Sequence, residues 1–210
     1  MDKNEIAVDV FNKLASAYQD KFMDVNGYGD TFDFFCNSIK KENAEILELA
    51  CGPGNITKYL LQKRPDFKIL GTDLAPNMID LAKLNNPTAE FQLMDCRDLE
   101  RIEKKYEAIM CGFCLPYLSK EEAVKLIKDS SIVLKPKGLL YISTMEDEYS
   151  KSAFKKGSGG DEIFMHYHEA GYLTNALEEN QFKILKLQRQ DYPMPDGTTA
   201  IDLILIAEKE

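Results

Sequence analysis

The feature that most constrains this chain is an alternation of short apolar runs with helical stretches from residue 45 onward. Runs rich in Ile, Leu and Val lie near 45–50, 67–73, 89–93, 106–112 and 137–145, and stretches with helical periodicity lie between them near 54–63, 76–84 and 119–134. This alternation is typical of βαβ units, in which helices cover both faces of a parallel sheet. We therefore expect one α/β domain, because 210 residues fit one domain better than two.

The two ends of the chain follow other patterns. Residues 1–40 carry apolar side chains at spacings of three and four, which predicts amphipathic helices interrupted at 26–30; the side chains are Ile6, Val10, Leu14, Ala17, Tyr18, Phe32, Phe35 and Ile39. After a helix near 169–180, apolar runs at 182–189 and 200–208 are joined by a short segment with Pro and Gly. So short a connection predicts an antiparallel pair, since a parallel crossover needs a dozen residues or more.

Two further sequence features predict local structure. Ser119 with Glu122 three residues later predicts a capping box at the start of the helix near 119–134. Residues 147–166 contain Gly-Ser-Gly-Gly and no sustained periodicity, so we expect a mobile excursion above the sheet.

The most informative segment is residues 46–57, where a buried strand runs into a turn with Gly52 and Gly54 and then into a helix. Glycines allow a ligand to approach the backbone closely, and a helix N-terminus favours electron-rich groups. The next strand ends at Asp73, whose carboxylate can accept hydrogen bonds from both hydroxyls of a ribose. A third strand ends at Asp95 and Cys96, where a carboxylate and a backbone N–H suit the amino edge of adenine. Three adjacent strand ends thus fit an adenosine.

With these residues the sequence resembles the class I S-adenosylmethionine-dependent methyltransferases, at motif level across roughly residues 40–146. The resemblance implies a three-layer α/β/α Rossmann-like methyltransferase fold, with a seven-stranded, mostly parallel sheet and an antiparallel C-terminal strand. It also implies S-adenosylmethionine as cofactor, S-adenosylhomocysteine as product, and transfer of a methyl group to a small-molecule acceptor.

The resemblance also assigns roles to individual positions. Glu48 stands at the acidic position of the first strand, before Cys51, Gly52 and Gly54. The remaining positions are Asp73 for the ribose, Asp95 and Cys96 for the adenine, Leu74 and Met78 packed on the adenosine, the backbone of Ala50 and Cys111 for the methionine part, and Tyr18 as a cover.

Other uses of the same scaffold stay open. A dinucleotide fingerprint would place a third glycine at position 57, which is Thr57. A non-catalytic adenosyl-ligand-binding protein, or another transferase such as an aminopropyl transferase, would keep the glycine turn. Binding with or without methyl release discriminates these alternatives.

Methyl transfer is an in-line displacement in which the protein mainly aligns the nucleophile, so no universal catalytic residue is expected. An acceptor that needs a base would find candidates in His166 and His168, which could instead be surface groups or help to start the next helix. Phe113 and Tyr117 follow the fourth strand and are candidates for the acceptor pocket. Several apolar side chains could form a lid or only a hydrophobic rim: Tyr149, Phe154, Phe164, Tyr167, Tyr192 and Met194.

Cys111 and Cys114 have the CxxC spacing of redox or metal sites, but no second ligand pair exists in the sequence. Core packing is the simpler interpretation, and we expect no metal. The five cysteines form an odd count in apolar segments, which indicates reduced thiols.

Charge and composition limit the partners. The chain has 35 acidic and 26 basic side chains, a formal charge of -9, so its field would repel nucleic acid and anionic membranes. No apolar stretch approaches the roughly 20 residues that span a bilayer, and the N-terminus lacks signal-peptide features, so we expect a cytoplasmic protein. Within a single domain, 1–210, we expect capping helices at 1–40, a cofactor-binding core at 41–146, an acceptor-side lid at 147–168, and a C-terminal helix and hairpin at 169–210. The oligomeric state cannot be inferred.

Overall fold

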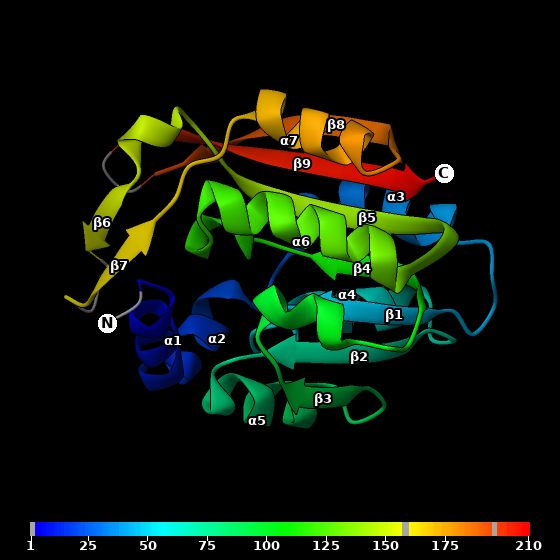
Figure 1. Cartoon of the computed structure of the whole chain (residues 1–210). Coiled ribbons are helices and arrows are strands. Elements are labelled where there is room, and N and C mark those ends of the chain that lie inside the picture. Colours follow the sequence, from blue (N-terminus) through cyan, green and yellow to red (C-terminus); the bar gives the residue numbers. More distant parts are fainter. Residues whose placement is uncertain (1–2, 157–159, 195–196) are drawn as a thin grey trace.

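A seven-stranded sheet forms the centre of the computed structural model, which describes residues 3–156, 160–194 and 197–210 (Figure 1). Its strand order is β3-β2-β1-β4-β5-β9-β8. The strands are β1 (Glu45–Leu49), β2 (Lys68–Asp73), β3 (Glu90–Leu93), β4 (Tyr106–Cys111), β5 (Leu134–Glu146), β8 (Phe182–Pro193) and β9 (Thr199–Lys209). The first five are parallel to one another, and β9 is antiparallel to both of its neighbours. The predicted sheet and its antiparallel C-terminal strand are confirmed.

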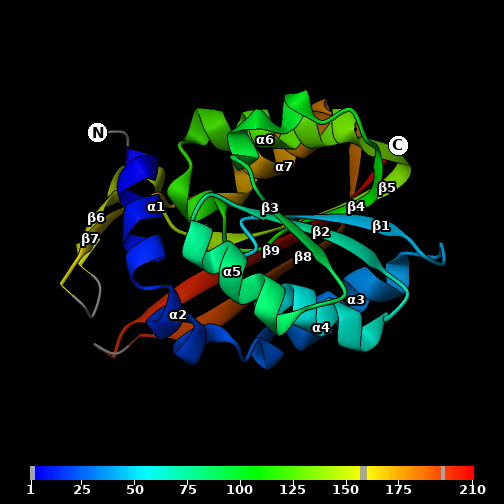
Figure 2. The ribbon, with the colours of Figure 1, turned by 90° about the horizontal axis from the view of Figure 1, so that it is seen from below.

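Helices cover both faces of the sheet, which makes three layers (Figure 2). One face carries α3 (Gly29–Ser38), α4 (Asn55–Lys63) and α5 (Pro76–Asn85), and the other carries η2 (Cys96–Arg101), α6 (Lys120–Val133) and α7 (Ala170–Glu179). Adjacent side chains of β1 therefore point into different cores: Ile46 packs with α3 and α4, and Leu47 packs with α6 and α7, both fully buried. Burial on both faces explains why the strand is continuously apolar.

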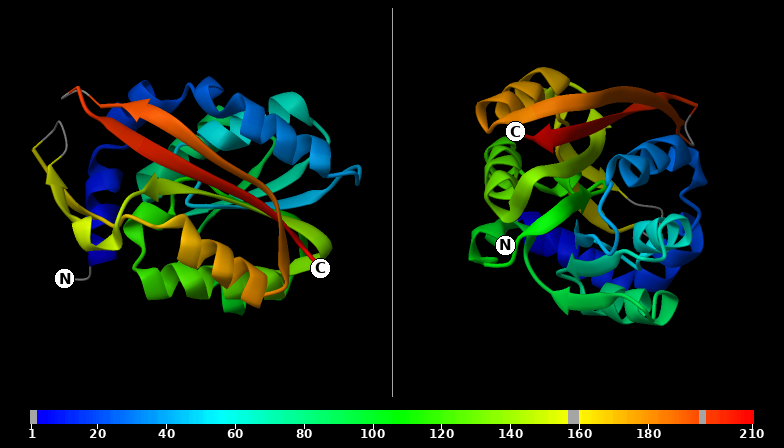
Figure 3. Two further views of the ribbon diagram at one scale, coloured as in Figure 1. Left: turned by 90° about the horizontal axis from the view of Figure 1, so that it is seen from above. Right: turned by 90° about the vertical axis from the view of Figure 1, so that its right-hand side faces the viewer.

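Local signals set several boundaries as expected. The Ser119 side chain accepts from the backbone N–H of Glu122, and the Glu122 carboxylate accepts from the backbone N–H of Ser119, which completes the predicted capping box of α6. The long hairpin of β8 and β9 confirms the antiparallel pair predicted from the short connection (Figure 3).

The segment 147–166 differs from the expectation of irregular structure. After a turn of 3-10 helix, η4 (Tyr149–Lys151), it forms a two-stranded antiparallel sheet of β6 (Ala153–Lys156) and β7 (Glu162–Met165). Contacts between the two strands stabilise this sheet, for example the edge-to-face contact of Phe154 with Phe164, although neither strand has a periodic sequence. Most of the Gly-Ser-Gly-Gly segment, residues 157–159, lies outside the described residues.

The N-terminal helices α1 (Lys3–Lys13) and α2 (Ala15–Phe22) lie with β6 and β7 at the end toward which the parallel strands point (Figure 1). The predicted apolar residues Ile6 and Val10 on α1, and Leu14 just after it, are half-buried. Ala7 is the buried apolar residue of α1, and Val8 and Phe11, also half-buried, pack against Met78 of α5. Among the described helices, none combines the length and the apolar character needed to cross a bilayer.

Candidate functional site

The turn after β1 brings backbone close to the second strand. Ala50, Gly52 and Gly54 have φ of 50°, 53° and 77°, a left-handed conformation that favours glycine. The turn points the backbone N–H of Gly52 at the carboxylate of Asp73, with a distance of 2.9 Å from N to Oδ2. The predicted meeting of these two strand ends is therefore present.

Asp73 lies at the end of β2 with both carboxylate oxygens held by backbone. Besides Gly52, the N–H of Ala75 donates to Oδ1 at 2.8 Å. Burial raises the pKa of Asp73, while these N–H groups favour its ionised form. Each oxygen keeps a lone pair for a further donor, so the carboxylate can still accept hydrogen bonds from a diol.

Glu48 is almost completely buried on β1, with 1% of its surface exposed. The Thr57 hydroxyl donates to Oε2 at 2.5 Å, whereas Oε1 has no partner among the described residues. Burial raises the pKa of Glu48 to about 8. A neutral carboxylic acid with one unpaired oxygen therefore lies directly before the glycine turn.

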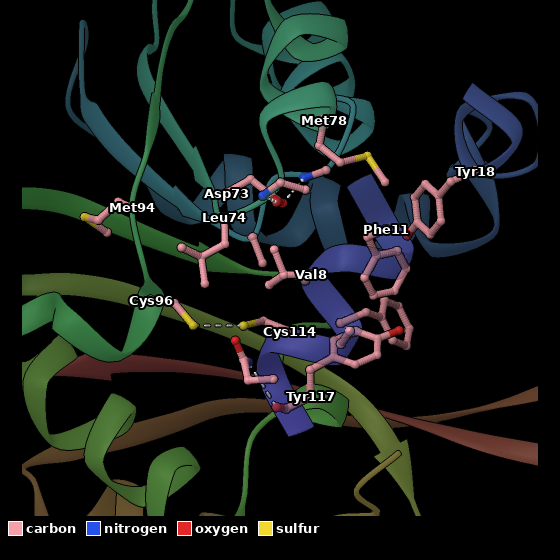
Figure 4. Close-up of a pocket in the computed structure, with 17 residues that line it drawn as sticks. Val8, Phe11, Tyr18, Asp73, Leu74, Met78, Met94, Cys96, Cys114 and Tyr117 are labelled. Atoms are coloured by element: carbon pink, nitrogen blue, oxygen red, sulfur yellow. Dashed lines mark hydrogen bonds between the residues drawn. The ribbon is translucent and has the colours of Figure 1, made fainter. Parts of the chain in front are cut away.

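A cavity opens beside this turn, between the carboxyl ends of the strands and the N-terminal helices (Figure 4). Its wall is mainly apolar, with Asp73 as the one acid among the lining residues. The lining consists of Asn4, Ala7, Val8, Phe11, Tyr18, Ala50, Gly52, Asp73, Leu74, Ala75, Met78, Met94, Cys96, Gly112, Phe113, Cys114 and Tyr117. Most of the predicted cofactor residues are thus brought together, and Leu74 and Met78 lie beside Asp73 as expected (Figure 4).

The cavity is narrow because α1 and α2 lie over it. Its volume is about 100 Å³, below the roughly 300–1,000 Å³ usual for ligand pockets. Val8 and Phe11 of α1 project into it, and Tyr18 of α2 lies against Gly52 (Figure 4). Burial, together with the nearby Asp73, raises the pKa of Tyr18 to about 12. A ligand of adenosyl size enters only when these side chains move aside.

Helix α1 is fastened to the β6–β7 sheet. The Lys13 ammonium forms an ion pair with Asp161 at 2.9 Å, and the Lys3 ammonium lies 3.3 Å from the centre of the Phe164 ring. The cover of the cavity therefore combines the N-terminal helices with the segment after β5.

The third strand end is arranged differently from the prediction. Asp95 does not line the cavity, because its carboxylate binds the Arg97 side chain, with distances of 2.7 Å to Nη2 and 2.9 Å to Nε, and caps η2 through the Arg97 backbone N–H. Cys96 and Met94 line the cavity instead. Arg97 stands only two positions after Asp95, and this spacing could have indicated that the two side chains form an ion pair.

The segment after β4 forms the opposite wall. Phe113 has φ of 52°, and its N–H donates to the Ser143 hydroxyl at 3.0 Å, which holds the backbone here against β5. Tyr117 also lines the cavity and packs edge-on against Phe11, with ring centroids 5.0 Å apart. Cys111 is fully buried in β4 and does not line the cavity.

The two histidines lie outside the cavity lining. His168 is fully buried; its Nε2–H donates to the carbonyl of Leu115 at 2.7 Å, so Nδ1 accepts from the Tyr172 hydroxyl. Burial lowers the pKa of His168 to about 4. The ring is a neutral structural group with both nitrogens engaged, which removes the reason to treat it as a base.

His166 is nearly buried and stacks on Tyr149, whose hydroxyl lies 3.3 Å from Nδ1. Burial lowers its pKa as well. It serves to hold η4 against β7. The other aromatic and apolar candidates for a lid, namely Phe154, Phe164, Tyr167, Tyr192 and Met194, do not line the cavity either.

The cysteines are buried thiols, as expected from their apolar segments. The Sγ atoms of Cys96 and Cys114 lie 3.4 Å apart at the cavity wall, and all five cysteines are reduced and buried. Hydrogen bonding with Cys114, followed by burial, raises the pKa of the Cys96 thiol well above its usual range. Within the described ranges, no group of three or more His, Cys, Asp or Glu could hold a metal ion.

Sequence reasoning missed the α1 residues of the wall, Ala7, Val8 and Phe11, because the helix has apolar side chains on more than one side. It also missed Ala75, Met94 and Cys114, although each adjoins a strand end that the motifs had marked.

Comparisons with known proteins agree with this geometry. Residues 46–138 match a family model described as a methyltransferase domain. The chain is 32% identical to the malonyl-[acyl-carrier protein] O-methyltransferase of Acetivibrio thermocellus over 108 residues, which cover 50% of this chain and 36% of that protein. The namesake protein of Priestia megaterium is 29% identical over 162 residues, which cover 69% of this chain and 58% of that protein. The chain thus spans less than two thirds of these curated relatives.

The fold also matches that of solved structures. The magnesium protoporphyrin IX methyltransferase of Synechocystis, in a crystal structure with bound S-adenosylhomocysteine, superposes with a TM-score of 0.75 at 17% identity and full coverage of both chains. A S-adenosylmethionine-dependent methyltransferase from Clostridium acetobutylicum superposes with a TM-score of 0.71 at 17% identity over 95% of this chain and 99% of that one.

Proposed function

We propose, from the premise that this chain belongs to the class I S-adenosylmethionine-dependent methyltransferases, that it transfers the methyl group of S-adenosylmethionine to a small-molecule acceptor. The observation that supports this most directly is the hydrogen bond between Gly52 and Asp73 at the wall of the cavity. It joins a backbone turn suited to close approach with a carboxylate suited to a ribose.

The chemistry of the wall fits the adenosyl group. Asp73 would accept from the ribose hydroxyls, and Leu74 and Met78 would pack against the adenine on the side facing Cys96. Asp95 would reach the adenine amino group only through the lone pairs that Arg97 leaves free. The turn at Ala50 and Gly52, with Glu48 behind it, would adjoin the methionine part.

The present volume requires that the cover move on binding. Val8, Phe11 and Tyr18 occupy the space in front of Asp73 and Gly52. We propose that α1 and α2 shift away from the strand ends to admit the cofactor and return over it afterwards. The same cover would then exclude water from the reacting atoms.

When bound, the cofactor supplies an activated methyl carbon, and the protein contributes alignment. The turn and Asp73 would hold one end of the reaction axis, and Phe113 and Tyr117 would guide an acceptor from the opposite wall. Orientation of this kind accounts for much of the acceleration in such displacements. The acidic total charge disfavours polyanionic acceptors such as nucleic acid.

The test is the binding of S-adenosylhomocysteine, measured by calorimetry and by thermal unfolding. At 100 times the dissociation constant, binding adds about 2.7 kcal/mol, which raises Tm by roughly 5–10 °C for a chain of this size. Asp73→Ala should lose most of this shift. Asp80→Ala, an exposed aspartate on α5, is the matched control and should keep it. An unchanged shift in Asp73→Ala would remove Asp73 as the ribose anchor, and absence of binding by the wild type would refute the proposed function.

A further inference from the structure

A buried carboxylate lies on β9, outside the predicted site. Asp202 on β9 has 3% of its surface exposed, and its Oδ2 accepts a hydrogen bond of 2.6 Å from the Tyr28 hydroxyl. Tyr28 ends the 3-10 turn η1 (Asn26–Tyr28) before α3. The two residues are 174 positions apart in the sequence.

The surroundings of Asp202 make it an unusual place for a charge. The next residues on the same face of β9 are Ile204 and Ile206, both fully buried in the apolar core. Among the described residues, no Lys or Arg forms an ion pair with Asp202. A buried acid supported by a single hydroxyl costs stability, so packing alone does not account for it.

The pair lies at the same sheet edge as the cavity. Asp202 is opposite Met145 near the carboxyl end of β5. Neither Tyr28 nor Asp202 lines the closed cavity, but the Tyr28 ring lies 5.2 Å, between centroids, from the ring of Phe113, which does. The Gln190 side chain of β8 donates to the carbonyl of Gly27 at 3.0 Å, which fastens the turn before Tyr28 to the sheet. Figure 3 shows the N-terminal segment running alongside this hairpin.

We propose that, once α1 and α2 have moved aside, the Tyr28 hydroxyl, held by Asp202, contacts the nucleophilic atom of a methyl acceptor seated beside Phe113 and takes up its proton, so that the acceptor is a hydroxyl or an N–H group and not a free carboxylate. The inference rests on the proposed function. Tyr28 is the catalytic residue in this scheme, and Asp202 acts through it.

The acceptor oxygen or nitrogen forms a bond to the methyl carbon, and the carbon–sulfur bond breaks with its electron pair remaining on sulfur. The acceptor proton passes to the Tyr28 oxygen while the Tyr28 proton passes to Asp202. Release of that proton to solvent restores the pair.

The charge of Asp202 disfavours a carboxylate as the methyl acceptor. A carboxylate acceptor is already ionised and needs no base, and beside the buried Asp202 it would meet like charge at low dielectric. A phenol, enol, alcohol or amine instead offers a hydrogen to the pair. The chemical class of the product therefore tests the proposal even before the acceptor is identified.

The first experiment supplies S-adenosylmethionine with a tritiated methyl group and the small-molecule fraction of a cell extract, and then treats the labelled product with alkali. Methyl esters release volatile methanol, whereas methyl ethers and methylamines do not. We expect alkali-stable label. Label released as methanol would overturn the acceptor class while leaving the proposed function intact, and no transfer despite S-adenosylhomocysteine binding would overturn both.

The second experiment compares Tyr28→Phe and Asp202→Asn with the wild type in the same transfer assay. We expect the transfer rate to fall about 10²–10⁴-fold, the range for loss of general-base catalysis, with an unchanged dissociation constant for S-adenosylhomocysteine. Tyr59→Phe is the matched control: its hydroxyl donates to the Asp33 carboxylate at 2.8 Å, and its ring packs on Phe32, which is not part of the cavity wall. It should keep the full rate. Full rates in the first two variants, or an equal loss of rate and cofactor affinity, would reduce the pair to a structural contact.

Discussion

Replacing Glu48 by glutamine should remove the contribution of this one side chain to the pH dependence of stability between pH 5 and 8. In the folded protein burial raises the pKa of Glu48 from its usual 4.5 to about 8. The side chain is therefore neutral in the folded protein at pH 7 and ionised in the unfolded chain. Glutamine has the size and neutrality of the protonated acid, and its oxygen can accept the hydrogen bond from Thr57.

The direction of the pH dependence follows from the number of protons that the folded and unfolded states bind. Between pH 4.5 and 8 the folded state holds a proton that the unfolded state has lost, so the free energy of unfolding falls as pH rises. The contribution is fully present below pH 4.5 and is lost progressively up to about pH 8. At about 1.4 kcal/mol per pH unit, the difference from 4.5 to 8 amounts to about 5 kcal/mol in all, of which about 2.5 kcal/mol falls between pH 5 and 7.

The assay is urea unfolding at pH 5, 6, 7 and 8, without ligand, for the wild type, Glu48→Gln and Glu45→Gln. The measured quantity is the difference in free energy of unfolding between variant and wild type, in which the other titrating groups cancel. Relative to the wild type, Glu48→Gln should gain about 2.5 kcal/mol between pH 5 and 7, and it should be the more stable protein at pH 8. Glu45 lies on the same strand but is paired with Lys104 near the surface, so its variant should show no such gain.

A constant difference between Glu48→Gln and the wild type across this range would refute the reasoning. So would a glutamine variant that is less stable than the wild type at pH 8. A constant difference would mean that Glu48 is ionised in the folded protein across this range, and a less stable variant would mean that the amide does not replace the protonated acid at this site.

Two further predictions concern the glycine turn after β1 and the thiols of the cavity wall. Gly54→Ala should lower the free energy of unfolding by about 1–3 kcal/mol, because φ is 77° and a new Cβ would lie 2.3 Å from the buried Asn86 amide. Gly171→Ala is the control, since this helical glycine has open space around it, and it should stabilise the protein by about 0.5–1 kcal/mol. Equal effects of the two substitutions in thermal unfolding would show that Gly54 is not under backbone strain. The thiols of Cys96 and Cys114 should react slowly with an alkylating reagent at pH 8 and rapidly in urea, because hydrogen bonding and burial raise their pKa values; a fast thiol in the folded protein would instead support the redox interpretation.

Much of the candidate site was predictable because its signals are local. Gly52 and Gly54 follow a buried strand directly, and Asp73 ends the next one. Parallel strands that are neighbours in a sheet end at the same edge, so the order of elements was enough to bring these residues together. The prediction for Asp95 was incomplete, because Arg97 competes for the carboxylate through contacts that a motif does not describe.

Other parts were not predictable, because their signals were ambiguous. Helix α1 has apolar residues on two sides, and only docking on α5 and the strand ends selects the side with Ala7 and Phe11. Histidine often acts as a general base, but burial and the hydrogen bond to the Leu115 carbonyl make His168 a structural group. Residues 147–166 form two strands because they pair with each other, and not because either is periodic enough alone.

The sequence by itself determined the order of strands and helices, the glycine turn with its acids, and the resemblance to a methyltransferase, because these depend on neighbours along the chain. The tertiary structure alone decided how far the N-terminal helices close the cavity, and that Tyr28 meets Asp202 across 174 positions. Burial and pairing between distant segments depend on packing, and packing sets both the space left for a ligand and the protonation of the groups around it.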